Sequence, residues 1–292
     1  MSDRLAGKIC VITGTGGAMG RATALTFARE GALIVGCDVA VEAAEETAEL
    51  VRAAGGEMVS LQPCRLSDSA ECERLVEFAT DRFGGIDVLF NLAGRAYFDR
   101  LEDISDADWD SARRDEVDLV FYLTRAAWPW LKAGHGVVVN MASLNGSLSF
   151  KQIPSLSHTA NKAAVIGMTR QLALEGSEHG IRVNSISPGL IESKATEAQL
   201  ADAEWTGAMV GRTLLGRLGR PEEVANVEPE LLFEISGGGD IDGMAAQSPC
   251  HGGDIETGKV EPGHTRCLFQ GGNGRPRPRS PRRDRVRPAV CP

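Results

Sequence analysis

Three side chains that can hold or move a proton follow one another behind an apolar run: Ser143, His158 and Lys162. A hydroxyl can hold a substrate oxygen, and an imidazole transfers protons near neutral pH because it ordinarily titrates at about 6.5. Lys162 follows His158 by four residues, which places both side chains on one face of a helix. The spacing therefore predicts an acid–base site in which a cation favours the neutral imidazole.

Short β-rich runs alternate with longer amphipathic runs from residue 8 to about 190. They predict strands at 8–13, 32–37, 57–64, 86–91, 136–142 and 182–187, and helices at 19–30, 41–54, 70–83, 109–132 and 157–179. This alternation is typical of a single α/β domain with a doubly wound parallel sheet, the Rossmann fold.

A glycine-rich turn, Thr13-Gly14-Thr15-Gly16-Gly17-Ala18-Met19-Gly20, connects the first strand to the first helix. Such turns let the backbone approach a pyrophosphate, and the start of the helix offers free N–H groups. Asp38 ends the second strand, where a carboxylate accepts hydrogen bonds from the adenosine ribose. An acid there repels the 2′-phosphate of NADP, and no Arg or Lys occurs in 39–50, so NAD is favoured over NADP.

Two further motifs, Asn91-Leu92-Ala93-Gly94 and Ser187-Pro188-Gly189-Leu190-Ile191-Glu192-Ser193, follow in order. Together these motifs resemble the short-chain dehydrogenase/reductase family over residues 8 to about 193. The resemblance implies that the cofactor is held by Gly14, Gly16, Gly17, Met19, Gly20, Asp38, Leu66, Asn91, Ala93, Gly94, Lys162, Pro188, Gly189, Ile191 and Ser193. Three positions of the cofactor motifs depart from the family pattern. Ala18 replaces a glycine, Arg65 replaces an aspartate near the adenine, and Leu92 replaces an asparagine.

In the resembling family a serine holds the substrate oxygen, a tyrosine moves the proton, and a lysine binds the nicotinamide ribose. Ser143 and Lys162 match these roles, but His158 stands in the tyrosine position. Ser143 and His158 are 15 residues apart, farther than usual, so the connection between them must bulge. Since Lys162 favours the neutral imidazole, the set alone is biased towards alcohol oxidation.

Glu116 corresponds to a helix asparagine of the family, and a carboxylate pointing into the site would stabilise the imidazolium. The alternative is that Glu116 belongs to the charged run 113–116 and faces solvent. Only two tyrosines occur, Tyr97 and Tyr122, so a displaced catalytic tyrosine is not expected. Tyr97 either hydrogen-bonds a substrate oxygen or packs at the rim of the pocket.

The net charge of −9 includes seven Arg against one Asp in 271–292, so the rest of the chain is strongly acidic and nucleic-acid binding is not expected. No apolar run is long enough to span a membrane, and no secretion signal is visible, so we expect a cytoplasmic protein. The seven cysteines and the five histidines show no ligand spacing. Reduced thiols and no metal site are therefore expected.

Composition changes after Asn226, where Gly-rich and then Pro/Arg-rich sequence begins. We therefore predict a domain at 1–226, with a helical, apolar substrate lid at 193–218, and a largely disordered tail at 227–292. Alternatives for the tail are a basic segment that binds a partner and a change of reading frame.

Two functions follow from the resemblance. The first is an NAD-dependent dehydrogenase for a small secondary alcohol or ketone, with Ser143, His158, Lys162 and Glu116 as its working set. The second is a non-catalytic or impaired dinucleotide-binding protein. A homodimer or homotetramer is implied, assembled through the helices at 109–132 and 157–179.

Overall fold

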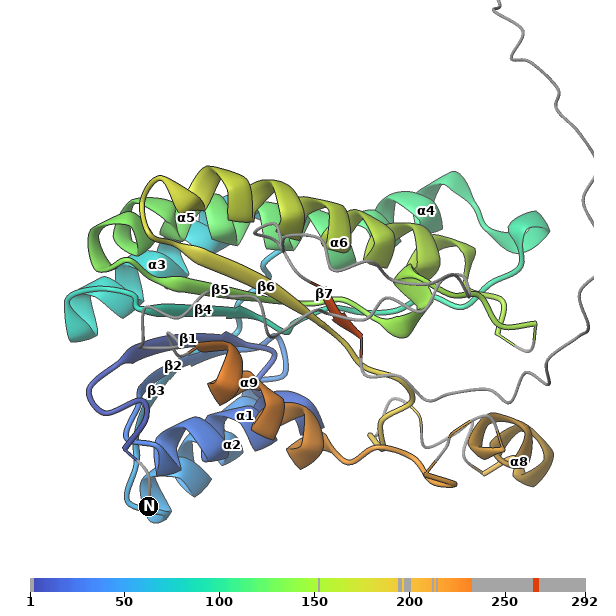
Figure 1. The fold of residues 1–292 in the computed structure, drawn as a ribbon, viewed down its shortest axis with the longest axis horizontal. Coiled ribbons are helices and arrows are strands. Elements are labelled where there is room, and N and C mark those ends of the chain that lie inside the picture. Colours follow the sequence, from blue (N-terminus) through green and yellow to red (C-terminus); the bar gives the residue numbers. More distant parts are fainter. Residues whose placement is uncertain are drawn as a thin grey trace, which may run out of the picture.

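The chain folds around one parallel β-sheet with helices on both faces (Figure 1). The computed structural model describes residues 3–151, 153–193, 196, 201–211, 213, 215–232 and 265–267. The strands are β1 (Ile9–Thr13), β2 (Leu33–Cys37), β3 (Glu57–Leu61), β4 (Val88–Asn91), β5 (Val137–Met141), β6 (Arg182–Ser187) and the short β7 (Thr265–Cys267). They lie in the order β3-β2-β1-β4-β5-β6-β7, and every neighbouring pair is parallel. The predicted doubly wound α/β fold is confirmed.

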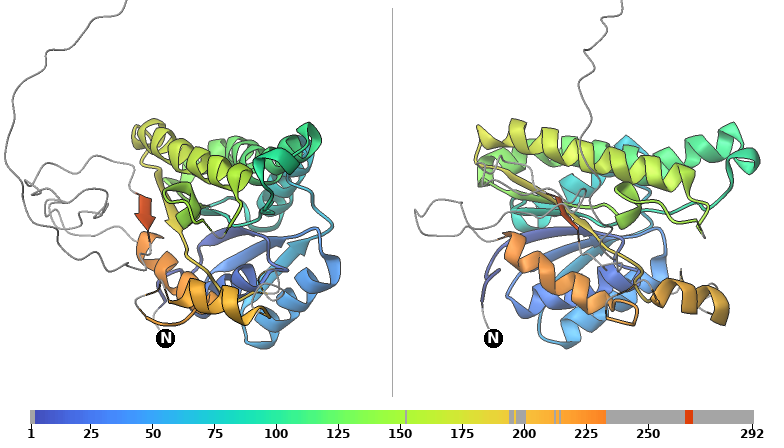
Figure 2. Two further views of the ribbon diagram at one scale, coloured as in Figure 1. Left: turned by 90° about the vertical axis from the view of Figure 1, so that its right-hand side faces the viewer. Right: turned by 45° about the vertical axis from the view of Figure 1, so that its right-hand side comes forward.

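Two layers of helices cover the sheet (Figures 1 and 2). One layer contains α3 (Ser69–Phe83), α4 (Asp106–Arg113), α5 (Leu119–Gly134) and α6 (Leu156–Ser177). The other contains α1 (Ala18–Arg29), α2 (Val41–Ala53) and α9 (Pro221–Leu232). The helix α8 (Ala203–Val210) and the short 3-10 turns η1 (Leu101–Asp103) and η3 (Leu144–Gly146) belong to connections.

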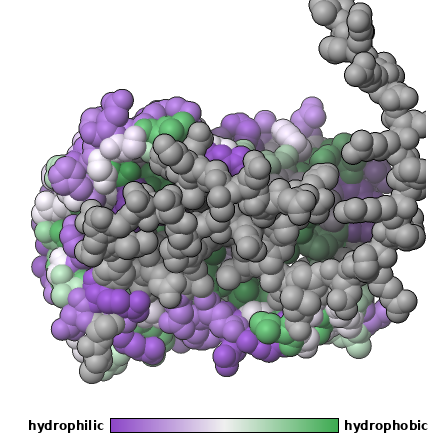
Figure 3. Space-filling view, viewed as in Figure 1, coloured by the Kyte–Doolittle hydropathy of each residue, from purple (hydrophilic) through white to green (hydrophobic). Residues whose placement is uncertain are grey.

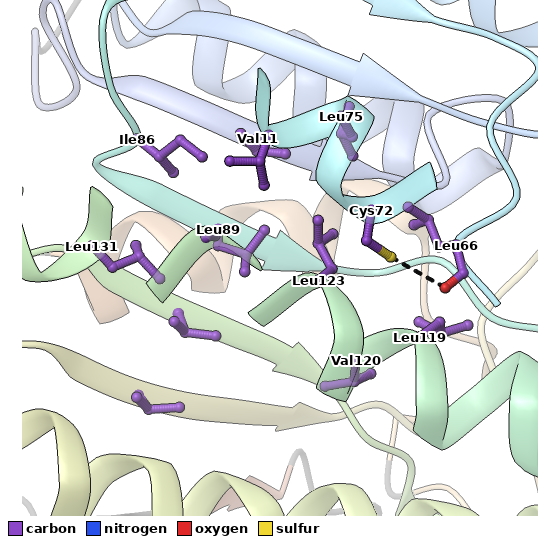
Figure 4. Packing of buried hydrophobic residues seen from close by; sticks show 14 of the residues in the cluster. Val11, Leu66, Cys72, Leu75, Ile86, Leu89, Leu119, Val120, Leu123 and Leu131 are labelled. Atoms are coloured by element: carbon purple, nitrogen blue, oxygen red, sulfur yellow. Dashed lines mark hydrogen bonds between the residues drawn. The ribbon is translucent and has the colours of Figure 1, made fainter. Parts of the chain in front are cut away.

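The strands present alternate residues to the two layers. Along β1, Val11 belongs to the apolar cluster under α3 and α5, which Figure 4 shows, whereas Cys10 and Ile12 belong to the cluster under α1 and α2. Because both faces of the sheet are buried, its strands are nearly continuous apolar runs. This is why the sequence pattern located six of them.

The long helix predicted at 109–132 differs from the structure in two respects. It begins at Asp106, where the Ser105 hydroxyl accepts a hydrogen bond from the Asp108 N–H at 3.1 Å. It is also interrupted, because residues Arg114–Asp118 form a π-helical turn, η2, between α4 and α5. A π turn inserts an extra residue per turn and so changes which side chains face inward.

Two elements lie beyond the predicted domain boundary at residue 226. The helix α9 continues to Leu232, and β7 pairs with β6. Most of the predicted tail at 227–292, and with it the prediction of disorder, lies outside the described residues. The predicted lid at 193–218 is described in part, and that part contains the helix α8.

Where residues are coloured on the face that Figure 3 shows, hydrophilic and apolar residues are interspersed. Within the described part of the chain, no helix is long and apolar enough to cross a membrane. Large exposed apolar side chains occur on α4, α5 and α6, namely Trp109, Phe121, Trp130 and Leu174.

Candidate active site and cofactor cleft

The glycine-rich turn after β1 leaves no room for side chains. Gly14 has a φ of +74°, and a Cβ on Gly20 would overlap the carbonyl oxygen of Gly14. Ala18 is tolerated because α1 begins there and its φ is not positive. Among the described non-glycine residues, only His135 has a positive φ. The N-cap Gly17 provides no side-chain cap, so the first N–H groups of α1 can bind an anion.

Asp38, at the end of β2, faces this turn. Its Oδ2 accepts a hydrogen bond from the N–H of Gly16 at 2.8 Å, and its Oδ1 accepts one from the N–H of Ala40 at 2.9 Å. These contacts fix the carboxylate, and each oxygen keeps a further lone pair. Asp38 can therefore accept additional hydrogen bonds from a ligand.

A cavity of about 820 Å³ lies beside the turn. The predicted cofactor residues that line it are Gly14, Gly16, Gly17, Met19, Asp38, Leu66, Ala93, Gly94 and Ser193. Arg65, which replaces the family's aspartate, lines it as well. The turn, the carboxylate and a cavity of this size together suit a dinucleotide.

Asn91, another predicted cofactor residue, faces away from this cavity. It is buried, and its Nδ2 donates hydrogen bonds to Asn140 Oδ1 at 2.9 Å and to Thr124 Oγ1 at 3.1 Å. Asn140 in turn donates to Thr169 Oγ1 at 3.0 Å. This buried network links the ends of β4 and β5 to α5 and α6, so Asn91 supports the cleft from behind.

The turn after β6 also holds its residues through the backbone. The Pro188 carbonyl accepts a hydrogen bond from the Leu144 N–H at 3.0 Å, and Ile191 forms a β-bridge with Gly219. Gly189 lies between these anchors. None of these predicted cofactor residues lines the cavity.

Glu116 lies in the π-helical turn and is 2% exposed. Its Oε1 contacts His158 Nδ1 at 2.6 Å, and its Oε2 accepts a hydrogen bond from Asn161 Nδ2 at 3.2 Å. The alternative that Glu116 faces solvent is therefore wrong. A carboxylate this close to Nδ1 requires the proton to lie on that nitrogen, so Nε2 is the ring atom left to accept another.

Lys162 is buried beside this pair. Its Nζ donates a hydrogen bond to the Met141 carbonyl at 2.9 Å and lies 3.8 Å from Glu116 Oε1. Burial lowers the pKa of Lys162, and the Glu116 carboxylate opposes that shift. A Cβ on Gly94 would lie 3.9 Å from Nζ, so the ammonium group lies next to the wall of the cavity.

Ser143 follows β5, and its Oγ accepts a hydrogen bond from the Asn145 N–H at 3.2 Å. The turn that it opens packs directly on α6, because a Cβ on Gly146 would lie 2.8 Å from the carbonyl carbon of Lys162. Asn145 Nδ2 also donates to Ser155 Oγ at 3.1 Å, which ties the start of the long connection to its end. The structure thus places the segments that carry the three predicted groups side by side.

The loop after β4 contacts His158. The ring centroids of Phe98 and His158 are 5.4 Å apart, and Phe98 is 46% exposed. The Tyr97 hydroxyl donates a hydrogen bond to Asp115 Oδ2 at 2.8 Å, and the Arg95 guanidinium lies 5.2 Å from the Tyr97 ring centroid. Tyr97 is thus engaged by the protein, and Phe98 is the exposed side chain beside the imidazole.

Three residues of this site were not predicted from the sequence: Phe98, Asp115 and Asn161. Asn161 could have been found, because a residue three positions after His158 shares its helix face. The partners of Phe98 and Asp115 come from distant segments, and no local pattern indicates them.

Comparisons with known proteins cover the segments that form this site. The family model described as Enoyl-(Acyl carrier protein) reductase matches residues 14–236. The 3-oxoacyl-(acyl-carrier-protein) reductase FabG of Thermotoga maritima is 36% identical over 236 residues, which cover 80% of this chain and 92% of the relative. The cyclohexanol dehydrogenase of Acinetobacter sp. (strain SE19) is 35% identical over 236 residues, which cover 80% of this chain and 91% of the relative.

A solved structure agrees with these sequence matches. The short-chain type dehydrogenase/reductase from Mycobacterium marinum is similar with a TM-score of 0.74 at 27% identity, covering 78% of this chain and 89% of that one. The family match includes both the glycine-rich turn and the segment from His158 to Lys162. The chain therefore belongs to the short-chain dehydrogenase/reductase family, a family of oxidoreductases that bind a nicotinamide dinucleotide.

Proposed function

We propose that this chain is an NAD-dependent oxidoreductase that interconverts a secondary alcohol and the matching ketone, with His158 as its acid–base group. The buried contact of 2.6 Å between His158 and Glu116 carries this proposal. A carboxylate on one ring nitrogen orients the imidazole and stabilises the imidazolium that forms when the other nitrogen accepts a proton. Two relatives are named for a cyclohexanol and for a 3-oxoacyl group, which supports an alcohol or ketone as substrate.

The cleft supports NAD as the cofactor. Asp38 keeps lone pairs for the ribose hydroxyls, and its charge would repel a 2′-phosphate. Arg65 lines the same cavity, and its planar guanidinium is suited to stack on the adenine. A nicotinamide cofactor bound in this cleft would supply the acceptor for the hydride of the alcohol carbon.

The proton step belongs to the chain's own residues. Ser143 Oγ holds the substrate oxygen by a hydrogen bond, and His158 Nε2 takes the hydroxyl proton. The imidazolium that results lies against Glu116 Oε1. In the reverse direction the imidazolium returns the proton to the ketone oxygen.

Glu116 also changes the expected bias of the reaction towards alcohol oxidation. Lys162 alone would favour the neutral imidazole, but the carboxylate lies 3.8 Å from the Lys162 ammonium and 2.6 Å from the imidazole. One anion thus faces two cationic groups once His158 is protonated. We infer that both oxidation and reduction are supported.

A second candidate function is dinucleotide binding without turnover. One observation favours this second function: both tyrosines are engaged elsewhere in the protein, so neither can replace His158 in proton transfer. The Tyr97 hydroxyl is bound to Asp115, and Tyr122 packs against the apolar cluster under α3 and α5.

NADH fluorescence titration followed by rate assays separates the two functions. The assays use NAD with cyclic, aliphatic and steroidal secondary alcohols, and His158→Gln is the matched variant. The oxidoreductase proposal expects turnover by the wild type and a loss of about 10²-fold or more in kcat for the variant, with NADH affinity retained. Cofactor binding without turnover on any alcohol or ketone would establish the second function instead.

We further propose that the chain forms a homodimer or homotetramer. The exposed apolar side chains of Trp109, Phe121, Trp130 and Leu174 support association through α4, α5 and α6. Size-exclusion chromatography with light scattering tests this, and a monomer at all concentrations would contradict it.

A further inference from the structure

Two thiols lie together beside Asp38 in the cofactor cleft. Cys37 ends β2, and Cys64 lies in the connection from β3 to α3. Both are free and buried, 1% and 2% exposed, yet both line the cavity of about 820 Å³. The Cys64 N–H donates a hydrogen bond to the Asp38 carbonyl at 2.9 Å, which holds this loop against the end of β2.

The two thiols belong to the same apolar cluster, and Cys64 Sγ also donates a hydrogen bond to the Glu71 carbonyl at 3.9 Å. The neighbouring Cys37 thiol lowers the pKa of Cys64, whereas Cys64 and burial raise the pKa of Cys37. Cys64 is therefore the better nucleophile, since the thiolate is the reactive form, and Cys37 holds the proton.

The other described thiols lie in different surroundings. Cys72 Sγ donates a hydrogen bond to the Leu66 carbonyl at 3.3 Å (Figure 4), and it does not line the cavity. Cys10 belongs to the apolar cluster on the opposite face of the sheet, where burial raises its pKa. Among the described residues no group of three or more His, Cys, Asp or Glu could hold a metal ion, so redox chemistry suits the pair better than metal binding.

We propose that Cys37 and Cys64 form a redox-sensitive pair, which a hydroperoxide that enters the empty cleft oxidises to a disulfide, and that this disulfide weakens cofactor binding. The Cys64 thiolate attacks hydrogen peroxide, so that an S–O bond forms, the O–O bond breaks and hydroxide leaves. The Cys37 sulfur then attacks the sulfenic acid, an S–S bond replaces the S–O bond, and the Cys37 proton leaves with the oxygen as water. In sum, two thiols are oxidised and one peroxide is reduced to two molecules of water.

The position of the pair explains the expected effect on the cleft. A disulfide holds its sulfur atoms at about 2.05 Å, closer than two free thiols can approach, so the loop that carries Cys64 must move towards β2. The next residue after Cys37 is Asp38, and the next after Cys64 is Arg65, and both line the cavity. The movement therefore narrows the place where the adenosine of the cofactor would lie.

Peptide mapping and NADH titration of the full chain test this proposal. The reduced protein is treated with excess hydrogen peroxide, with and without NAD, and free thiols are then alkylated. We expect a Cys37–Cys64 cross-linked peptide, slower cross-linking when NAD is present, and an NADH Kd raised about tenfold or more, which corresponds to about 1.4 kcal/mol. Dithiothreitol should reverse both changes.

Two variants provide the controls. Cys64→Ala should make NADH affinity insensitive to peroxide. Cys72 belongs to the same apolar cluster as Cys64, and the Cys72→Ala variant should still form the cross-link. Absence of the cross-link in the wild type, or a cross-link that leaves NADH affinity unchanged, would overturn the proposal. The mass measurement does not depend on turnover or on NAD binding, so it can succeed even where the proposed function fails.

Discussion

Replacing Glu116 by Gln tests the proposed acid–base pair most directly. The change keeps the size of the side chain and removes its charge in a site where the residue is 2% exposed. The carboxylate oxygen lies 2.6 Å from His158 Nδ1, so the charge that stabilises an imidazolium is removed at contact distance. The buried Lys162, whose Nζ lies 3.8 Å from Glu116 Oε1, then remains without this anion, and its charge repels an imidazolium.

The magnitude follows from Coulomb's law. Two unit charges whose centres are about 4 Å apart interact by about 4 kcal/mol at an effective dielectric constant of about 20. If the proton is fully transferred to His158 in the transition state, the whole of this energy is lost, and kcat/KM falls about 10³-fold. If the proton is half transferred, about 2 kcal/mol is lost, and kcat/KM falls about 30-fold.

The assay is kcat/KM for alcohol oxidation with NAD, measured for the wild type and for Glu116→Gln at the same pH. Asp118→Asn is the matched control, since Asp118 belongs to the same π-helical turn but pairs with Arg113 at 2.7 Å. A loss below about threefold in Glu116→Gln would refute the reasoning.

Four further predictions concern the same site. His158→Tyr alone sets a phenol against the Glu116 carboxylate, which disfavours tyrosinate, so the double variant His158→Tyr/Glu116→Asn should exceed it in kcat/KM by about tenfold or more; equal rates would contradict this. Asn161→Leu removes the donor to Glu116 Oε2 and should lower the free energy of unfolding in urea by about 1–3 kcal/mol. The buried Lys162 has a pKa below its usual 10.5, so its charge opposes folding at lower pH and this penalty fades as pH rises through the lowered pKa. The free energy of unfolding of the wild type in urea should therefore rise between the lowered pKa and pH 10.5, and Lys162→Met should lack this rise. Asp38→Ser should weaken NADH binding in fluorescence titration and reduce the preference over NADPH, and an unchanged ratio of the two affinities would contradict the role of the carboxylate.

Most of the fold could be predicted because the sheet is buried on both faces. Runs such as 8–13 and 136–142 are apolar at nearly every position, and the glycine-rich turn follows the first of them. The ends of elements were less accurate. The strand predicted at 57–64 ends at Leu61, since hydropathy does not show where backbone pairing stops.

The inward position of Glu116 could not be predicted from helical periodicity. In a regular helix a charged run such as 113–116 is typical of a solvated face, and Arg113 does face outward to pair with Asp118. The π-helical turn changes the angle between successive side chains and brings Glu116 inside. Sequence similarity indicated the position, but only the three-dimensional structure shows its contacts.

The two roles considered for Tyr97 illustrate a different limit. Its place after Gly94 indicated a pocket loop but could not distinguish a hydroxyl bound to substrate from one bound to protein. In the structure the Tyr97 hydroxyl donates a hydrogen bond to Asp115, which belongs to the same π-helical turn as Glu116. That turn thus holds both the loop beside the imidazole and the carboxylate against it.

The sign of charge gives a reason for His158 and Glu116 to occur together. A tyrosine beside Lys162 works as an anion, so a lysine alone supports it, but a histidine works as a cation and requires an anion. With His158 neutral, Lys162 and Glu116 balance each other, and in the proposed oxidation of an alcohol the charge gained by His158 would equal the charge lost by the nicotinamide. With tyrosine at position 158 and Glu116 retained, the site would hold two anions during the reaction. With His158 and asparagine at position 116, it would hold two cations, the imidazolium and Lys162. Because Glu116 and Lys162 are 2% and 7% exposed, solvent would screen neither combination well, and the proposed function therefore requires both His158 and Glu116.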